Sequence, residues 1–201
     1  MAVLMLKNKR LGFPALATPQ AIGDGEPAYG GRLIIQPNDP DVAAIDKAIE
    51  KVAREKWKDK GADVLPVLRE DKKVCFLKSP YRSAKTGKVY DGFEDSFSLG
   101  MRNAKAKPTA VDKYGKEITD KSEIERILYS GCYVNAKVEI WAQDNSFGRR
   151  INCSVLGVMF ADDGPSFGGG SAPASADEFA SLAAKPEDDL NAATDGAEDY
   201  V

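Results

Sequence analysis

Three side chains within one stretch have the types and spacing needed to stack on flat ligands. Tyr133, Lys137 and Trp141 stand four residues apart, and the residues between them alternate between apolar and polar. In an extended strand this spacing places all three on one face, across about 26 Å. Flat rings accept any nucleobase, and a lysine between them can neutralise a phosphate. The strand alone leaves a second interpretation equally open, in which both rings pack beneath a loop or helix.

Bases and aromatic rings also occur together in residues 72–107. This segment holds nine bases, three acids and five aromatic residues. We expect Phe76, Phe93 and Phe97 to serve the core, while the remaining rings and bases form a surface for a polyanion. We predict that one part of this surface is a flexible clamp, made of Lys78, Tyr81, Arg82, Lys85, Lys88 and Tyr90. The other part is a groove wall, made of Arg102, Lys105 and Lys107. Lysines placed in a loop only for solubility are the alternative.

A β-hairpin would position the stacking residues. The apolar positions of residues 132–141 face the core, so the stacking candidates face outward. A connection at 143–148 leads to a returning strand at 149–160, which begins with Arg149 and Arg150. These two arginines are predicted to flank the stacking face.

Other elements complete a mainly β body. Strands are expected at 10–18, interrupted by Pro14, and at 32–36, 97–102 and 109–111. The clearest helix follows Asn38 or Asp39 as its cap, with apolar residues at helical spacing from 42 to 52 and a charged, solvated opposite face. We expect this helix to end at Gly61, with Pro66 preventing continuation. A small helix is expected around 122–128.

The charge of the chain is divided between its two ends. Residues 161–201 carry ten acids and one base, whereas residues 1–160 carry 27 bases and 21 acids. We predict a basic domain at 1–162 and a flexible, disordered acidic tail at 163–201. The tail could compete with a polyanion, recruit a partner, or only aid solubility.

Several chemistries are excluded or weak. The chain has no histidine, which excludes Ser/His/Asp and Cys/His catalysis. Its three cysteines lack Cys-x-x-Cys spacing, so we expect small buried residues, no disulfide framework and no zinc knuckle. A metal site made of carboxylates alone has no signal in the sequence, and we expect no metal and no cofactor. A nuclease that uses Asp91, Glu94 and Asp95 to hold a metal is a remote alternative. Apolar runs are too short to span a membrane, and the expected location is the cytoplasm.

Particular strings resemble a known family. They are YDGF at 90–93, KPTAVD at 107–112, YSGCYVNAKVEIWAQDN at 129–145, RIN at 150–152 and LGVMF at 156–160. Together with KNKRLGFPAL near the start, they are similar to a family of bacteriophage single-stranded-DNA-binding proteins, once catalogued as a domain of unknown function. The resemblance covers nearly all of residues 1–165.

The resemblance implies an oligonucleotide-binding (OB) β-barrel with one main helix, which coats single-stranded DNA during phage replication and recombination in the infected bacterial cell. It also implies that the acidic tail contacts replication proteins such as polymerase or helicase/primase. The tail residues assigned to this contact are Glu187, Asp188, Asp189, Glu198, Asp199 and Tyr200. The chain departs from the family pattern at Lys107, where arginine is common, and at its penultimate Tyr200.

The expected mode is non-enzymatic binding without sequence preference, on the face of Tyr133, Lys137 and Trp141. The alternative is a β-barrel that binds proteins and has no affinity for nucleic acid. The oligomeric state, monomer or homodimer, is left open.

Overall fold

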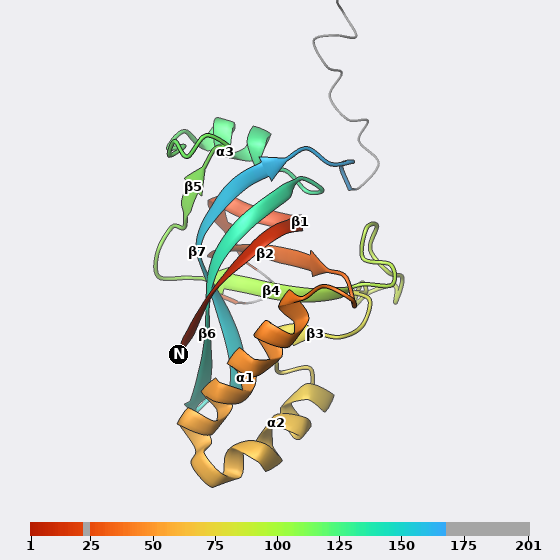
Figure 1. The fold of residues 1–201 in the computed structure, drawn as a ribbon, viewed down its shortest axis with the longest axis vertical. Helices are drawn as coiled ribbons and strands as arrows, with labels where there is room; N and C mark the ends of the chain where they lie inside the picture. Colours follow the sequence, from red (N-terminus) through yellow and green to blue (C-terminus); the bar gives the residue numbers. More distant parts are fainter. Residues whose placement is uncertain (22–24, 168–201) are drawn as a thin grey trace, which may run out of the picture. The chain divides into compact units, whose positions relative to one another are not determined.

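The computed structural model of this chain describes residues 1–21 and 25–167. Most of the predicted acidic tail, including all six of its predicted partner-binding residues, lies outside the described residues. The described part is mainly β, with one long helix, as predicted (Figure 1).

The strands form one curled sheet. They are β1 (Ala2–Gln20), β2 (Ala28–Ile35), β3 (Phe76–Leu77), β4 (Phe97–Asn103), β5 (Thr109–Val111), β6 (Tyr133–Asn145) and β7 (Gly148–Asp162), in the order β3-β4-β2-β1-β6-β7-β5. β1 pairs antiparallel with both β2 and β6, and β5 pairs parallel with β7. Asn103 at the end of β4 donates to the Val155 carbonyl of β7 at 3.0 Å, which helps to close the barrel.

β1 is longer than the sequence pattern predicts. It begins at Ala2 rather than near residue 10, because its first half pairs with β6 and its second half with β2. Pro14 does not interrupt it, since a register shift between Gly12 and Ala15 accommodates a residue that lacks an N–H donor. The outward-facing residues Val3 and Met5 are apolar although they are more than half exposed. The first half of β1 therefore lacks the apolar/polar alternation by which a strand is recognised in a sequence.

The main helix is present but ends earlier than predicted. In α1 (Asp41–Trp57), Asp39 rather than Asn38 supports the first turn, accepting the Asp41 N–H at 2.9 Å. The helix stops at Trp57, and a 3₁₀ turn at Lys58–Lys60 follows. The predictions for Gly61 and Pro66 were wrong, because both lie within a second helix, α2 (Gly61–Glu70).

Tertiary packing explains this second helix. Leu65 and Leu68 are buried and give α2 an apolar side. A Cβ atom on Gly61 would lie 3.0 Å from the Ala53 carbonyl oxygen, so the small residue allows α2 to pack closely against α1. The two helices lie at one end of the sheet, and α3 (Lys121–Ile127) lies at the other end (Figure 1).

The predicted faces of the hairpin are confirmed. The inner residues of β6 are fully buried and join Ile151, Cys153 and Val155 of β7 in the core. Phe76 and Phe93 are also buried, whereas Phe97 is half-buried at the edge of the core. Cys132 and Cys153 are buried as expected, whereas Cys75 is only half-buried. Burial raises the pKa of the Cys132 thiol to about 12, so this thiol is protonated at neutral pH.

A buried ion pair joins β1 to the start of α1. Lys9 is 6% exposed, and its Nζ lies 2.7 Å from Asp39 Oδ2 and 2.8 Å from Asp41 Oδ2. Burial alone would lower the pKa of Lys9, but the two carboxylates outweigh it and the pKa is raised. The pair therefore fixes the helix against the strand that carries the surface described next.

Within the described residues, no helix has the length and apolar character needed to cross a membrane.

Candidate nucleic-acid interface

Four aromatic rings gather on the outer side of the sheet where β1 bends. Phe13 comes from β1, and Tyr81, Tyr90 and Phe93 come from the segment between β3 and β4. The rings of Tyr81 and Tyr90 stack with centroids 5.4 Å apart, and Phe13 meets Tyr90 edge-on at 4.9 Å. Phe93 is fully buried, whereas 47% of the Phe13 surface is exposed. This aromatic cluster therefore has one anchoring ring and three rings that solvent can reach.

The register of the strands makes room for the cluster. Gly12 of β1 lies opposite Arg32 of β2, and Arg32 lies opposite Gly100 of β4, so these three residues share the outer face. A Cβ atom on Gly12 would lie only 2.6 Å from the Phe93 ring. Glycine at position 12 is what allows Phe93 to sit directly on the sheet.

Arg32 is the central cation of this face. Its guanidinium carbon lies 3.7 Å from the centre of the Tyr81 ring, and its Nη1 donates to Ser98 Oγ at 3.0 Å. Burial lowers the pKa of Arg32, but a guanidinium starts so high that it stays charged. No carboxylate of the described residues forms an ion pair with it. A partly desolvated cation of this kind is stabilised by an anionic ligand.

Two further arginines share the outer face. Arg10 donates from Nε to the Gly131 carbonyl at 3.2 Å and from Nη2 to the Pro165 carbonyl at 2.6 Å. Arg102 donates to the Glu26 carbonyl. Like Arg32, neither has an acidic partner among residues 1–21 and 25–167. We call Arg10, Arg32 and Arg102 the arginine row.

The last described residues lie against one end of this surface. Residues 163–167, which we call the exit segment, are held by Tyr129, whose hydroxyl donates to the Gly164 carbonyl at 2.9 Å. The centre of the Phe167 ring lies 4.2 Å from the Arg10 guanidinium and 6.2 Å from the centre of the Phe93 ring. The chain therefore leaves the described part beside the arginine row and the aromatic cluster.

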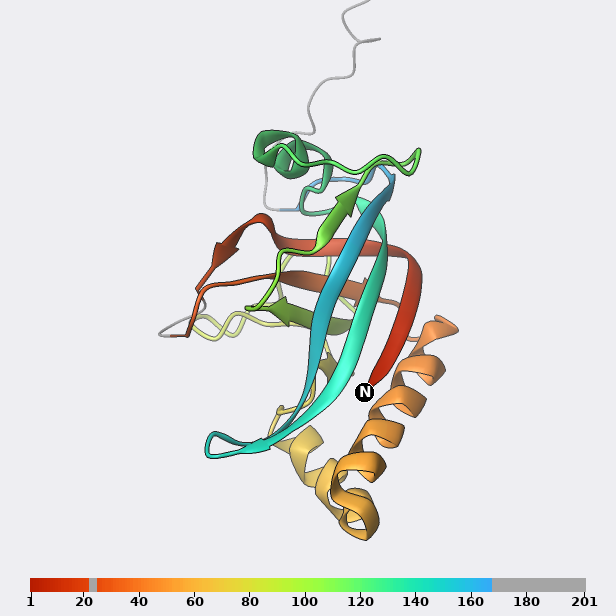
Figure 2. The same cartoon turned by 90° about the vertical axis from the view of Figure 1, so that its left-hand side faces the viewer.

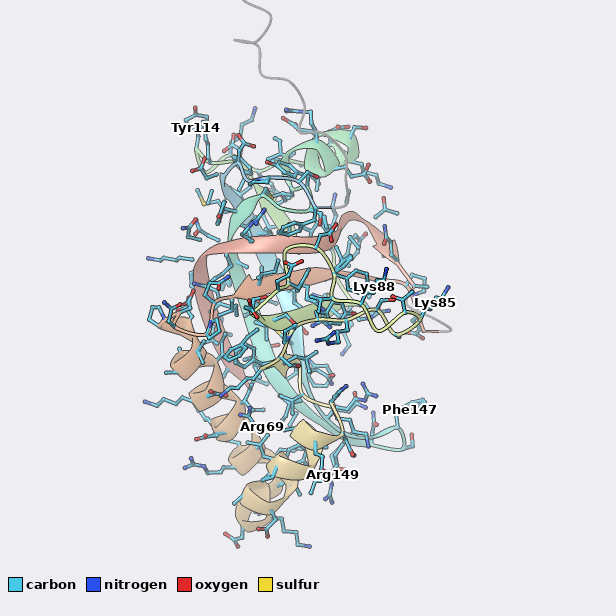
Figure 3. All side chains as sticks on the ribbon, turned by 90° about the vertical axis from the view of Figure 1, so that its right-hand side faces the viewer. Arg69, Lys85, Lys88, Tyr114, Phe147 and Arg149 are labelled. Atoms are coloured by element: carbon cyan, nitrogen blue, oxygen red, sulfur yellow. The ribbon has the colours of Figure 1, made fainter. Side chains whose placement is uncertain are left out.

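The structure brings part of the predicted clamp to this surface. Tyr81 and Tyr90 belong to the aromatic cluster, and the chain between them forms a tight loop in which Arg82 donates to the Gly87 carbonyl at 3.1 Å. Lys85 and Lys88 extend from this loop into solvent (Figure 3). Lys78, by contrast, is tied to Asp46 of α1 at 2.5 Å and does not join the loop's cations.

The predicted groove wall is divided. Arg102 lies in the arginine row, while Lys105 and Lys107 are exposed on the connection from β4 to β5. The β4 backbone therefore leads directly from the arginine row to the two lysines.

The three stacking candidates of β6 share an outer face, as their spacing predicts. Their surroundings differ, however. Tyr133 lies at the arginine row, with its ring centre 5.6 Å from the Arg10 guanidinium. Lys137 is exposed opposite Met5, and Trp141 is half-buried, donating from Nε1 to Ser154 Oγ at 2.9 Å. A role for Lys137 and Trp141 in binding stays a prediction.

Arg149 and Arg150 lie near the tip of the β6–β7 hairpin. Arg149 pairs with Asp144 at 3.3 Å, and Arg150 is exposed. In Figure 2 this tip and the loop between β3 and β4 both lie at the left, but Figure 1 shows the loop at the right of the barrel and the lower ends of β6 and β7 at the left.

Carboxylates do not gather into a metal site in the part of the chain that the structure describes. Asp91, Glu94 and Asp95 are all exposed there, and the geometry lends the nuclease alternative no support.

Sequence reasoning missed Phe13, Arg10 and Arg32. All three lie in strands whose many apolar residues indicate a role in the hydrophobic core. That pattern gave no reason to assign these three residues to a binding surface. The available signal was Arg32 itself, a charge between Gly31 and the apolar run Leu33–Ile35, since a cation in such a strand needs a ligand or an acidic partner.

Comparison with known proteins identifies the family. Residues 2–191 match the family model described as "Enterobacter phage Enc34, ssDNA-binding protein". Protein p50 of Acyrthosiphon pisum secondary endosymbiont phage 1 is 32% identical over 191 residues, which cover 93% of this chain and 97% of that protein.

Solved structures confirm the predicted OB-like fold. The single-stranded DNA-binding protein from bacteriophage Enc34, solved in complex with ssDNA, matches with a TM-score of 0.68 and 24% identity, over 83% of this chain and 89% of its own. The single-stranded DNA-binding protein gp2.5 of bacteriophage T7 matches with a TM-score of 0.53 and 16% identity, over 97% and 99%. The chain therefore belongs to the phage ssDNA-binding protein family represented by that of Enterobacter phage Enc34.

Proposed function

We propose that this chain binds single-stranded DNA without sequence preference and acts without catalysis during phage replication and recombination in the cytoplasm of the infected cell. The observation that carries the proposal is the arginine row beside the aromatic cluster. Three guanidinium groups that have no carboxylate partner among the described residues, next to partly exposed rings, match the two chemical features of a single strand, its phosphates and its base faces.

The place of this surface in the barrel supports the proposal. β2 and β4 are the second and third long strands of the barrel, and the corresponding face of OB folds binds oligonucleotides. Family membership points the same way, because the matching family model is described as an ssDNA-binding protein.

The structure suggests how each group would act. Arg32 lies over the Tyr81 ring and is already held by Ser98, so it loses little freedom when a phosphate arrives. Phe13 and the tyrosines offer ring faces and edges for bases of any kind. Lys85 and Lys88, exposed on the neighbouring loop, would neutralise further phosphates.

The proposal includes the tail as a competitor for the same cations and as a contact for replication proteins. Residues 161–201 carry ten acids against one base, and the exit segment that leads to them lies beside Arg10. Attachment at this place raises the effective concentration of tail carboxylates near the arginine row.

Fluorescence anisotropy of a labelled oligo-dT, repeated at several salt concentrations, tests the proposal. Binding should weaken with salt at a log–log slope near −0.7 per neutralised phosphate. A duplex of the same length and an oligoribonucleotide serve as comparisons. Absence of binding at low salt would contradict the proposal and favour a protein-binding barrel.

A further inference from the structure

Two apolar side chains lie exposed side by side on the first half of β1. Val3 is 53% exposed and Met5 is 54% exposed, although Leu6 of the same strand is buried. Both residues precede the part of β1 that carries the proposed interface. Figure 1 shows this half of β1 beside the lower part of β6, whereas the loop between β3 and β4 lies at the right. Exposed apolar side chains that adjoin one another, rather than lying singly, are typical of an interaction surface.

The register of β1 and β6 gives each of these side chains a charged neighbour. Val3 lies opposite Glu139, and Met5 lies opposite Lys137. Residues that lie opposite each other in antiparallel strands share one face of the sheet, and this face is the outer one because the intervening Val138 is fully buried. We call Val3, Met5, Lys137 and Glu139 the outer patch.

The two charges of the outer patch have no partner in the part of the chain that the structure describes. Neither Lys137 nor Glu139 forms an ion pair with any of those residues. Since they stand two residues apart on one strand, they are separated by about 6.6 Å at the usual rise. The outer patch therefore presents one cation and one anion beside a pair of apolar side chains.

This arrangement is complementary to a second copy of itself. A two-fold axis that lies between two facing sheets, level with Val138 and perpendicular to the strands, reverses the strand direction. It brings Lys137 of each copy against Glu139 of the other, and Val3 of each copy against Met5 of the other. A polyanion, by contrast, would match Lys137 and be repelled by Glu139.

We infer that the outer patch is a homodimer interface, in which Val3 and Met5 of two copies pack together while Lys137 and Glu139 form two ion pairs across the two-fold axis. This dimer goes beyond the proposed function and does not depend on it. Arg32 and Arg102 of the arginine row lie on β2 and β4, so both remain available to single-stranded DNA in each copy.

The size of the outer patch indicates a weak dimer. Four side chains per copy bury less than the about 800 Å² per partner that stable complexes bury, and smaller interfaces belong to transient complexes. We therefore expect the full chain to pass from monomer toward dimer at tens of micromolar. Sedimentation velocity of the full chain, from about 1 to about 300 µM, measures this equilibrium.

Charge reversal on the full chain tests the geometry. Lys137→Glu leaves two acids on the outer patch and Glu139→Lys leaves two bases, so each variant alone should dimerise about tenfold more weakly than the wild type. An equimolar mixture of the two variants should associate about as strongly as the wild type, because each acid then meets a base. Lys47→Glu, at an exposed position of α1, is the matched control and should dimerise like the wild type.

Met5→Ser tests the apolar half of the outer patch, and it should weaken the dimer without any change of charge. A wild-type chain that stays monomeric at the highest concentration would overturn the inference. So would a dimer of equal strength in the wild type and both charge variants, or a mixture that associates no better than its components. A loss of affinity for oligo-dT in Lys137→Ala with unchanged self-association would also overturn it, and would assign this face to DNA instead. None of these outcomes alters the role proposed for the arginine row, which oligo-dT anisotropy tests separately.

Discussion

Arg32 is the residue on which the proposed interface depends most. It lies over the Tyr81 ring, donates to the Ser98 hydroxyl and has no carboxylate partner within residues 1–21 and 25–167, at the centre of the β1–β2–β4 face. A lysine could keep the charge, but it could not lie flat on Tyr81.

Replacing Arg32 by alanine should weaken binding to oligo-dT by roughly 10- to 100-fold, the value of one or more charged hydrogen bonds. The log–log salt slope should become shallower by about 0.7, since one phosphate contact is lost. The affinity of Arg32→Lys for oligo-dT should lie between those of the wild type and Arg32→Ala. Arg54→Ala is the control, because Arg54 is 72% exposed on α1 and pairs with Glu50. Equal effects of Arg32→Ala and Arg54→Ala would contradict the assigned role.

At the level of single residues, the sequence predicted the types of side chain better than their assembly. Alternation correctly placed Tyr133, Lys137 and Trp141 on one outer face. It could not show that Trp141 bonds to Ser154, because that contact depends on the register of the β6–β7 hairpin. Nor could it show that Phe13 joins Tyr81 and Tyr90, because those residues are far apart in the chain and meet only in the folded barrel.

At the level of elements, the loop between β3 and β4 carries the most exposed cations of the proposed contacts. Its ends are fixed by Phe93 and by the backbone bond from Tyr90 to the Tyr81 carbonyl, whereas Lys85 and Lys88 are exposed between them. The loop therefore has a fixed base and a charged tip.

Changing Lys85 and Lys88 together to alanine should lower affinity for single-stranded DNA about tenfold at low salt and reduce the salt slope by up to about 1.4, two phosphate contacts' worth. Stability should not change, because both side chains are exposed. The matched control is the pair Lys47 and Lys51, exposed on α1, whose replacement should leave affinity unchanged. Anisotropy titration measures the affinities, and a loss seen equally in both double variants would indicate only a general charge effect.

The junction of β1 with α1 depends on Lys9. Replacing Lys9 by methionine leaves Asp39 and Asp41 without their shared cation and should lower the free energy of unfolding by roughly 3 kcal/mol. Lys7→Met, on an exposed position of the same strand, should have little effect.

The raised pKa of Lys9 also sets a pH dependence. Its stabilising contribution is fully present below the unfolded value of 10.5 and is lost as pH rises through the higher folded value. Urea unfolding of the wild type should therefore show a loss of stability above about pH 10.5 that Lys9→Met lacks. Parallel pH profiles for the two proteins would contradict this role.

Among the elements, regular patterns were predicted well and tertiary exceptions were not. The α1 periodicity and the β6–β7 alternation are local and strong, and both were confirmed. The second helix was missed because Gly61 and Pro66 usually end helices, while here close packing against Ala53 and burial of Leu65 and Leu68 stabilise it.

At the scale of the whole molecule, the acidic tail would compete with single-stranded DNA for the basic barrel. The division of charge is visible in the sequence, but the place where the tail joins the body is not. The structure locates this junction beside Arg10, through the exit segment.

Deleting residues 168–201 should tighten binding to single-stranded DNA, most strongly at low salt, where screening of the tail's charge is weakest. The gain should shrink as salt approaches physiological strength. A full-length variant whose tail Asp and Glu residues are changed to Asn and Gln separates charge from length, and it should match the truncated chain. Unchanged or weaker binding in both would leave solubility as the role of the tail.

Photocrosslinking with an oligonucleotide that carries 5-iodouracil, followed by mass spectrometry of the crosslinked peptides, tests the central claim most directly, because it reports which rings touch bases. We predict crosslinks to Phe13, Tyr81 or Tyr90 on the face of the arginine row, and their loss when unlabelled oligo-dT is added in excess. Specific crosslinks confined to Trp141 would contradict the placement of the interface on β1, β2 and β4. Crosslinks to the exposed Tyr114 alone would contradict it as well.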